Sequence, residues 1–257
     1  MEGSVKKPYV LIPLLILVGL ACTCPITLPN TTESQSIPTQ DNLEPTAASF
    51  DATTVVFDIA TATQSRPGPT FTAPPLPFYE DFTQLSRDWW LGEDEYGEVF
   101  LSNGELHIIN YTKAEFVEYT FPGINVGNVT LDVESYLAGG TDDNWISISC
   151  RLNPETFDEY NVAYSSDGYY AAYAFIDDER DYFAEATASS VIRQGIGEKN
   201  HMRLECAGDR IRFWINDVLL VDVRDDRLLT GDITLAVDAL GEEFSDVVFD
   251  NLSVSAP

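Results

Sequence analysis

One stretch, residues 200–226, constrains the fold of this chain more than any other. Its apolar residues recur at every second position on both sides of a turn at residues 207–209: Met202, Leu204, Cys206, Ile211, Phe213 and Ile215. Asn216 and Asp217 tolerate positive φ and suit a two-residue hairpin turn, after which the β-branched segment 218–223 returns. The pattern predicts three antiparallel strands, each with one apolar and one polar face.

Sheets of this kind must cover each other's apolar faces, so the expected fold class is all-β, a two-sheet antiparallel β-sandwich of the jelly-roll type. Further strands are predicted at residues 98–102, 105–110, 115–121, 129–137, 144–152, 160–165, 169–176, 231–239 and 246–255. Residues 177–197 are interpreted as a polar excursion. The total is about a dozen strands at roughly ten-residue spacing, with no helix pattern.

The charge of the chain restricts its partners. Its 42 Asp and Glu residues outnumber 14 Lys and Arg, which gives a net charge of -28. Phosphate binding needs a basic surface, so nucleic acid is excluded as a partner. The acidity itself indicates solubility.

The N-terminal segment, residues 1–24, has the features of an export signal. Lys6 and Lys7 precede a short apolar run that is interrupted by Pro13 and ends in small residues before Cys22. The end of this run resembles a bacterial lipoprotein signal, which implies lipidation of Cys22, with Cys24 as a second candidate. The expected location is therefore outside the cytoplasmic membrane or at the cell surface, held by a lipid anchor. An uncleaved signal anchor and ordinary secretion are the alternatives.

Residues 25–77 are rich in Thr, Pro, Ser, Ala and Asn, and they contain few residues that could build a core. This composition predicts a disordered N-terminal stalk. The folded domain is expected at residues 78–257, which is long enough for one well-buried β-domain.

The other two cysteines, Cys150 and Cys206, both fall on predicted core faces. Cys150 shares its face with Ile146 and Ile148, and Cys206 shares its face with Met202. In an exported domain this placement favours a disulfide. The alternative is two free thiols that pack as small apolar residues.

Several segments of the folded part carry a resemblance to a known family. They are Asp81-Phe82 with Trp89 after it, WISISCRL, EYNVAYSSDGYY, NHMRLECAGDRIRFWINDVLLVDV, GDITLAV and VVFDNLSV. Together they resemble the concanavalin A-like lectin and glucanase sandwiches, and within them the laminin-G-like and 3-keto-disaccharide hydrolase domains of exported bacterial proteins. The resemblance implies the fold, whereas the functions within it range from glycan binding to glycoside hydrolysis.

The catalytic pattern of the sandwich glucanases, Glu-x-Asp-x-x-Glu on one strand, is incomplete in this chain. The nearest string, residues 93–98, has Glu where the Asp belongs and lies between predicted strands. Asp132 and Glu134 alternate correctly on a strand, but no third carboxylate follows. The sequence therefore predicts no catalytic residues and favours a binding module.

A ligand-binding face is predicted opposite the core. Aromatic rings stack on sugar CH groups, and fixed polar groups beside them hydrogen-bond to hydroxyls. If the 200–226 meander pairs into the same sheet as residues 144–152, one face would collect Trp145, Arg151, Asn161, Tyr173, Arg203, Glu205 and Trp214. The alternative is that these side chains only cover a sheet.

Calcium is the one cofactor that the sequence suggests. Asp142 with Asp143, and Asp177 with Asp178, are oxygen-rich pairs in predicted loops, and Ca²⁺ prefers hard oxygen ligands. Solvated turns explain the same pairs. The combined expectation is a lipid-anchored head that binds carbohydrate or envelope glycans without catalysis. A glycoside-active enzyme and a protein-binding laminin-G-like head are the alternatives.

Overall fold

The computed structural model describes residues 76–111, 117–240 and 243–257. The predicted signal segment with Cys22 and Cys24, and the predicted stalk up to residue 75, lie outside the described residues. Within these described ranges no helix is long and apolar enough to cross a membrane.

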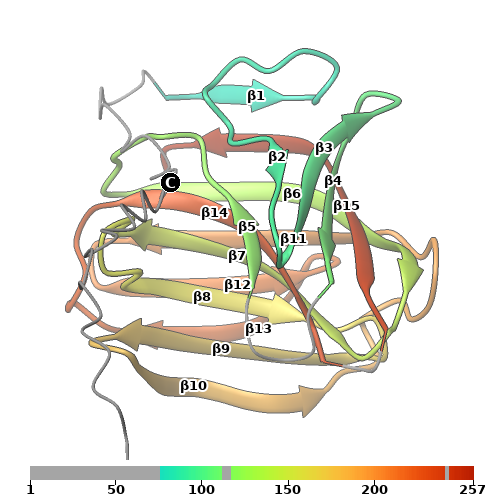
Figure 1. Ribbon diagram of the computed structural model, residues 1–257. Helices are drawn as coiled ribbons and strands as arrows, with labels where there is room; N and C mark the ends of the chain where they lie inside the picture. Colours follow the sequence, from blue (N-terminus) through green and yellow to red (C-terminus); the bar gives the residue numbers. More distant parts are fainter. Residues whose placement is uncertain (1–75, 112–116, 241–242) are drawn as a thin grey trace, which may run out of the picture. The chain divides into compact units, whose positions relative to one another are not determined.

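The described residues form fifteen strands in two antiparallel sheets, one of nine strands and one of six (Figure 1). The nine-stranded sheet contains β1 (Phe78–Glu80), β2 (Gly92–Glu93), β3 (Gly97–Ser102), β4 (Glu105–Asn110), β6 (Val129–Gly140), β11 (Asn200–Ala207), β12 (Arg210–Ile215), β13 (Val218–Arg224) and β15 (Ser245–Ser255). The six-stranded sheet contains β5 (Glu118–Thr120), β7 (Asn144–Leu152), β8 (Glu159–Tyr164), β9 (Tyr169–Ile176), β10 (Glu179–Ala188) and β14 (Asp232–Ala239). The predicted all-β sandwich is confirmed.

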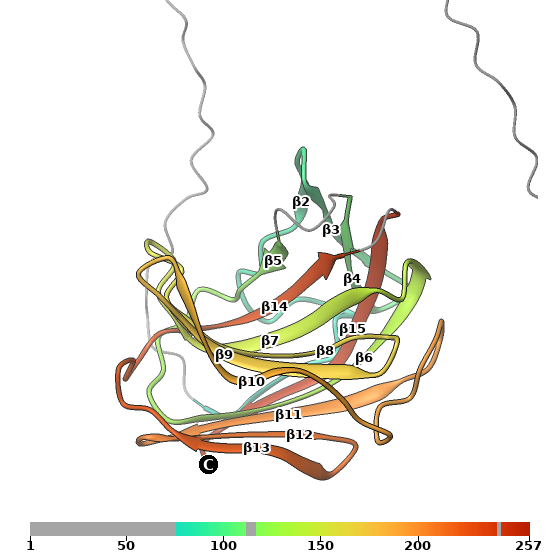
Figure 2. The ribbon, with the colours of Figure 1, turned by 90° about the horizontal axis from the view of Figure 1, so that it is seen from below.

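The strand order explains the two layers. The nine-stranded sheet runs β13-β12-β11-β6-β15-β4-β3-β2, with β1 on β15, and the six-stranded sheet runs β10-β9-β8-β7-β14-β5. Figure 2 shows β11, β12 and β13 in one layer and β7, β8 and β9 in the other. The β11–β12–β13 meander is the predicted one, and Asn216 and Asp217 make its turn with φ of 49° and 66°.

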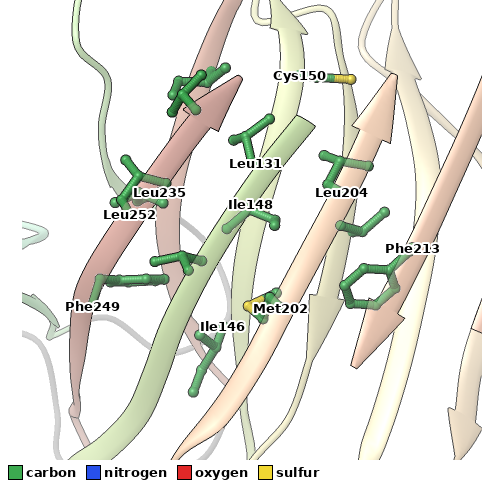
Figure 3. Packing of buried hydrophobic residues seen from close by; sticks show 14 of the residues in the cluster. Leu131, Ile146, Ile148, Cys150, Met202, Leu204, Phe213, Leu235, Phe249 and Leu252 are labelled. Carbon is green, nitrogen blue, oxygen red and sulfur yellow. The ribbon is translucent and has the colours of Figure 1, made fainter. Parts of the chain in front are cut away.

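The core lies between the sheets and is built from their alternating apolar residues. Ile146 and Ile148 of β7 face Met202 and Leu204 of β11 in Figure 3, and all four side chains are fully buried. Burial of apolar area on this scale is the main stabilising contribution to the fold.

The cysteine prediction is confirmed. Cys150 of β7 and Cys206 of β11 form a disulfide with a Cα–Cα distance of 6.8 Å, so one covalent bond joins the two sheets.

One expectation about the strands was wrong. The polar excursion contains β10, a ten-residue strand that pairs with β9 from Glu179↔Ile176 to Ala188↔Tyr169. β10 is the edge of its sheet, and most of its side chains are exposed, so it needs no apolar face. A strand without alternation leaves no period-two signal.

Candidate functional site

The outer face of the six-stranded sheet, which points away from the core, forms a cleft of about 860 Å³. Figure 1 shows β14, β7, β8, β9 and β10 side by side in this sheet. Each strand contributes every second side chain to the cleft, because successive residues of a strand point to opposite faces. The alternation that fills the core with Ile146 and Ile148 therefore sends Trp145 and Ser147 into the cleft.

Aromatic side chains dominate the walls of the cleft. The ring centroids of Tyr173 and Tyr182 lie 5.6 Å apart at an interplanar angle of 62°. Tyr119 and Phe157 make a second edge-to-face pair, with centroids 5.5 Å apart. The full aromatic set among the described lining residues is Tyr96, Tyr119, Trp145, Phe157, Tyr173, Phe175 and Tyr182. Rings at both ends offer flat apolar surfaces to a ligand several rings long.

Polar groups on the floor of the cleft are buried and partly unsatisfied. Asn161 donates from Nδ2 to Glu159 Oε1 at 2.8 Å, while its own Oδ1 has no hydrogen-bond partner among the described residues. Thr234 Oγ1 and Asp238 Oδ1 lack partners in the same part of the chain. Buried polar groups are normally paired, so these oxygens indicate a place for ligand or water donors.

The pKa values of two carboxyl groups in the cleft are shifted in the same direction. Burial raises the pKa of Glu159, against the opposing effects of its hydrogen bonds and of Arg180. Burial also raises the pKa of Asp238, again opposed by Arg180. The Arg180 guanidinium lies over the Tyr173 ring at 5.3 Å from its centroid. The cleft therefore combines aromatic surface with weakly solvated carboxyls, which is a setting for hydrogen bonding to hydroxyls or amines.

The structure brings together three of the residues predicted for the ligand face. Trp145, Asn161 and Tyr173 all line the cleft, on β7, β8 and β9. Asn161 pairs with Tyr173 across β8 and β9, which explains why both reach the same floor. Tyr170, three residues before Tyr173 on β9, packs against the core instead.

Arg203, Glu205 and Trp214 do not share that face. They lie on β11 and β12, in the opposite sheet, so the expected pairing of the meander with residues 144–152 was wrong. Their side chains belong to what we call the ion-pair ladder, on the outer face of the nine-stranded sheet. It contains Asp132–Arg203, Glu205–Arg212, Arg210–Asp222 and Asp209–Arg224. The Arg212 guanidinium lies 5.3 Å from the centroid of the Trp214 ring.

Arg151 is also outside the cleft, because β7 bulges at this residue. Leu152 pairs with Asp232 and Cys150 with Ile233, so Arg151 is an extra residue, with φ of 60°. Its guanidinium is buried and donates to the carbonyl oxygens of three loops: Leu228 at 2.6 Å, Gly208 at 2.7 Å and Gly127 at 3.3 Å. A bulge inverts the alternation beyond it, which sends Leu152 into the cleft.

The carboxylates considered for catalysis occupy the ladder side. Asp132 Oδ1 accepts from Arg203 Nε at 2.6 Å and lies 3.4 Å from His201 Nε2. Glu134 Oε2 accepts from Asn251 Nδ2 at 3.1 Å. Both residues are on β6 of the nine-stranded sheet, away from the cleft.

The predicted calcium ligands lie in exposed turns. Asp177 and Asp178, with φ of 55° and 63°, form the two-residue turn between β9 and β10, a role that their tolerance of positive φ explains. Asp142 and Asp143 are exposed between β6 and β7. The described residues contain no group of three or more His, Cys, Asp or Glu that could hold a metal.

The cleft residues that were not singled out from the sequence include Glu159, Arg180, Tyr182 and Asp238. Asp238 had a usable signal, since it alternates with Thr234 and Ala236 on the polar side of a predicted strand. Arg180 and Tyr182 had no such sequence signal, because they belong to β10, which was not predicted as a strand.

Comparison with known proteins tests the architecture. No protein-family model matches the chain, and no curated protein does. Solved structures do match. A carbohydrate-binding module, CBM66 from Bacillus subtilis, is 14% identical with a TM-score of 0.55, over 66% of this chain and 96% of that one. The Bacillus licheniformis β-glucanase is 10% identical with a TM-score of 0.54, over 70% and 98%. The fold is a concanavalin A-like β-sandwich.

A third match to the concanavalin A-like sandwich is a prokaryotic β-1,3-1,4-glucanase from a mouse hindgut metagenome. It is 12% identical with a TM-score of 0.54, over 70% of this chain and 99% of that one. The matches thus include a binding module and hydrolases on one fold. At these identities they establish the fold, and function has to be argued from the cleft itself.

Proposed function

We propose that this protein is a carbohydrate-binding module that holds a glycan in the cleft without cleaving it. The observation that carries the proposal is the combination of aromatic walls with buried oxygens on Asn161 and Thr234 that have no hydrogen-bond partner among the described residues. Sugar rings stack on aromatic faces, and their hydroxyls supply the donors that these oxygens lack. The carbohydrate-binding module and the glucanases that share the fold support the same class of ligand.

The positions of the shifted carboxyls favour binding over hydrolysis. Asp238 pairs with Trp145 near one end of β7, whereas Glu159 precedes Tyr160, which pairs with Cys150 near the other end. Five or six residues of strand separate the two, roughly 15–20 Å. Glycosidases need their two carboxyls about 5–9.5 Å apart, and the backbone positions of Glu159 and Asp238 are spaced more widely than that.

The test is calorimetric titration of the full-length chain against a panel of oligosaccharides and soluble polysaccharides, with a reducing-end assay on the same mixtures. We expect at least one glycan to bind and none to be cleaved. Trp145→Ala should weaken binding about tenfold or more, since loss of a stacking ring costs about 1–2 kcal/mol. Trp214→Ala is the matched control, a half-buried tryptophan on the opposite sheet, and should leave affinity within about twofold.

Binding that survives Trp145→Ala but is lost with Trp214→Ala would move the site to the ladder side. Release of reducing ends by the wild-type chain would replace the proposal with a glycoside-active enzyme. Capture of a protein partner together with no response to any glycan would favour the protein-binding alternative.

We also propose that the protein is exported and anchored by a lipid on Cys22. The sequence of residues 1–24 motivates this, and the Cys150–Cys206 disulfide supports it, because such bonds persist in oxidising compartments. Metabolic labelling with a radioactive fatty acid in a bacterial host should mark the wild-type chain and Cys24→Ser but not Cys22→Ser. Label retained on Cys22→Ser would contradict the assignment.

A further inference from the structure

The charge of the cleft is strongly one-sided. Among the described residues that line it, six are acidic and one is basic: Asp94, Glu118, Glu159, Asp178, Glu185 and Asp238, against Arg180. A carboxylate, sulfate or phosphate on a ligand would add negative charge to a space that already holds an excess of it. Coulomb repulsion in a partly desolvated cleft therefore disfavours acidic glycans.

Two buried side-chain oxygens in the cleft can accept hydrogen bonds from a ligand. Asn161 and Thr234 are 5% and 4% exposed, line the cleft, and each presents an oxygen without a hydrogen-bond partner in the described part of the chain. An unmet buried acceptor costs about 1–3 kcal/mol, so a ligand that donates to it gains that much. The Asn161 amide oxygen only accepts, so it needs a hydroxyl or ammonium donor, whereas the Thr234 hydroxyl can both donate and accept.

At one end of the cleft, a carboxylate and an indole are cross-strand neighbours. Asp238 of β14 pairs with Trp145 of β7, and both side chains line the cleft. Directly opposed residues place their Cβ atoms about 5 Å apart. Asp238 Oδ1 is buried without a hydrogen-bond partner among the described residues. A carboxylate beside an aromatic face provides the two attractions that a cation uses, charge pairing and cation–π contact.

We propose that the cleft selects glycans that carry free amino groups, with one ammonium seated between Asp238 and Trp145, and that it rejects acidic glycans. This inference rests on the proposed function, because it names the class of glycan for the same site. Burial of Asp238 opposes its ionisation in the free protein, and an ammonium against it offsets that cost.

The test compares tetrasaccharides in two series, and the amine-bearing and neutral members of each series differ only at carbon 2. Glucosamine, N-acetylglucosamine and glucose tetramers, all β-1,4-linked, and the α-1,4-linked galactosamine and galactose tetramers are titrated into the full-length chain at physiological salt. The galacturonic acid tetramer represents the acidic class. We expect an amine-bearing tetramer to bind about tenfold or more tightly than its acetamido or hydroxyl counterpart, and no binding of the acid.

Asp238→Asn should remove this preference while hydroxyl-bearing tetramers bind as before. Asp222→Asn, on the ion-pair ladder, removes the same charge from the chain and should keep the preference. That control separates a seated ammonium from general attraction to an acidic protein. The thermal midpoint of each variant verifies folding.

The outcomes separate the two proposals. If neutral tetramers bind and amines bind no better, or if Asp238→Asn keeps the preference, the inference is overturned and the proposed function stands. Binding of the acid as tight as that of the neutral tetramers also overturns the inference. If no member of the panel binds, this inference is overturned, and the broader panel of oligosaccharides and polysaccharides decides the proposed function.

Discussion

The cleft on one sheet and the ion-pair ladder on the other shift the pKa values of their carboxyl groups in opposite directions. In the six-stranded sheet, burial raises the pKa of Glu159 and Asp238, and no basic side chain among the described residues lies within ion-pair distance of either. On the ion-pair ladder, Arg210 lowers the pKa of Asp222, and Arg224 lowers that of Asp209. The pKa of Asp132, which lies next to His201 and Arg203, is also lowered, even though burial opposes the shift.

This contrast shows why aromatic and charged residues on a strand do not by themselves identify a binding face. Arg203, Glu205 and Trp214 resemble a glycan site in the sequence, yet the structure pairs Arg203 with Asp132 and Glu205 with Arg212. A face whose charged groups are paired offers less to a ligand. On the ladder one buried nitrogen, Arg212 Nε, lacks a hydrogen-bond partner among the described residues, whereas the cleft keeps three such oxygens, on Asn161, Thr234 and Asp238. Four predictions test this division.

Arg151 was predicted to bind ligand, but its position predicts a purely structural role. Arg151→Met should lower the free energy of unfolding by about 3 kcal/mol or more, because the carbonyls of Gly127, Gly208 and Leu228 lose their donor. Chemical denaturation measures the loss. Glycan affinity of the folded variant should not change. Arg224→Met, at an exposed position, is the control and should cost little; a large loss of affinity in Arg151→Met would return Arg151 to the binding face.

The disulfide joins the sheet that carries the cleft to the sheet that carries the ladder. Cys150→Ala with Cys206→Ala should destabilise the fold by about 2–4 kcal/mol, since the bond closes a loop across a sequence separation of 56 residues. Urea unfolding of the reduced wild-type chain should match that of the double variant. An unfolding midpoint that does not move on reduction would show that apolar packing alone holds the sheets.

The six-stranded sheet should lose stability as pH rises. Burial raises the pKa of Asp232 to about 7, although its carboxyl accepts from the backbone N–H of Ile124 and Ile233. The folded state therefore favours the protonated form. The contribution of Asp232 to the free energy of unfolding is complete below the ordinary pKa of about 4. It is lost as pH rises through about 7.

Asp232→Asn removes this titration. Between about pH 4 and pH 7, the unfolding free energy of the wild-type chain should fall relative to that of the variant by at most about 1.4 kcal/mol per pH unit. Urea unfolding across this range measures the difference. Asp222→Asn should change the pH dependence in the opposite direction. The pKa of Asp222 is lowered in the folded state, so its carboxylate stabilises the fold at pH values above its ordinary pKa, and that contribution is lost as pH falls. Parallel pH profiles for the wild-type chain and Asp232→Asn would contradict the assignment.

The ladder itself should contribute least. Arg203→Ala breaks the pair with Asp132, in which the arginine side chain is 40% exposed, and should cost less than about 1 kcal/mol. Glycan binding should stay the same, since the pair lies on the other sheet. A tenfold loss of glycan affinity in Arg203→Ala would contradict the assignment of binding to the cleft alone.

The sequence predicted the strands more fully than the site, and the reason is physical. Alternation specifies which face of a strand is apolar, so residues 144–152 and 169–176 match β7 and β9 to the residue. Alternation carries no information about which strands become neighbours. Trp145 and Trp214 were therefore placed on one face, although β7 and β12 belong to different sheets.

Two other features were not predicted from the sequence, for related reasons. The bulge that turns Arg151 away from the cleft is a single extra residue, visible only when the registers of β7 and β14 are compared. Edge strand β10 needs no apolar face, so Arg180 and Tyr182 gave no strand signal. Both cases concern the contact between strands, which a period in one segment does not record.

The covalent link between the sheets has a mechanical consequence. β1, the first strand of the fold, pairs with β15 in the nine-stranded sheet, while the cleft belongs to the six-stranded sheet. Tension between the chain that leads into β1 and a molecule held in the cleft must pass from one sheet to the other. Apolar contacts slide under such tension, whereas the Cys150–Cys206 bond does not. Release of the three-residue β1 would lengthen the chain before it by roughly 10 Å and would leave the bond between the two sheets intact.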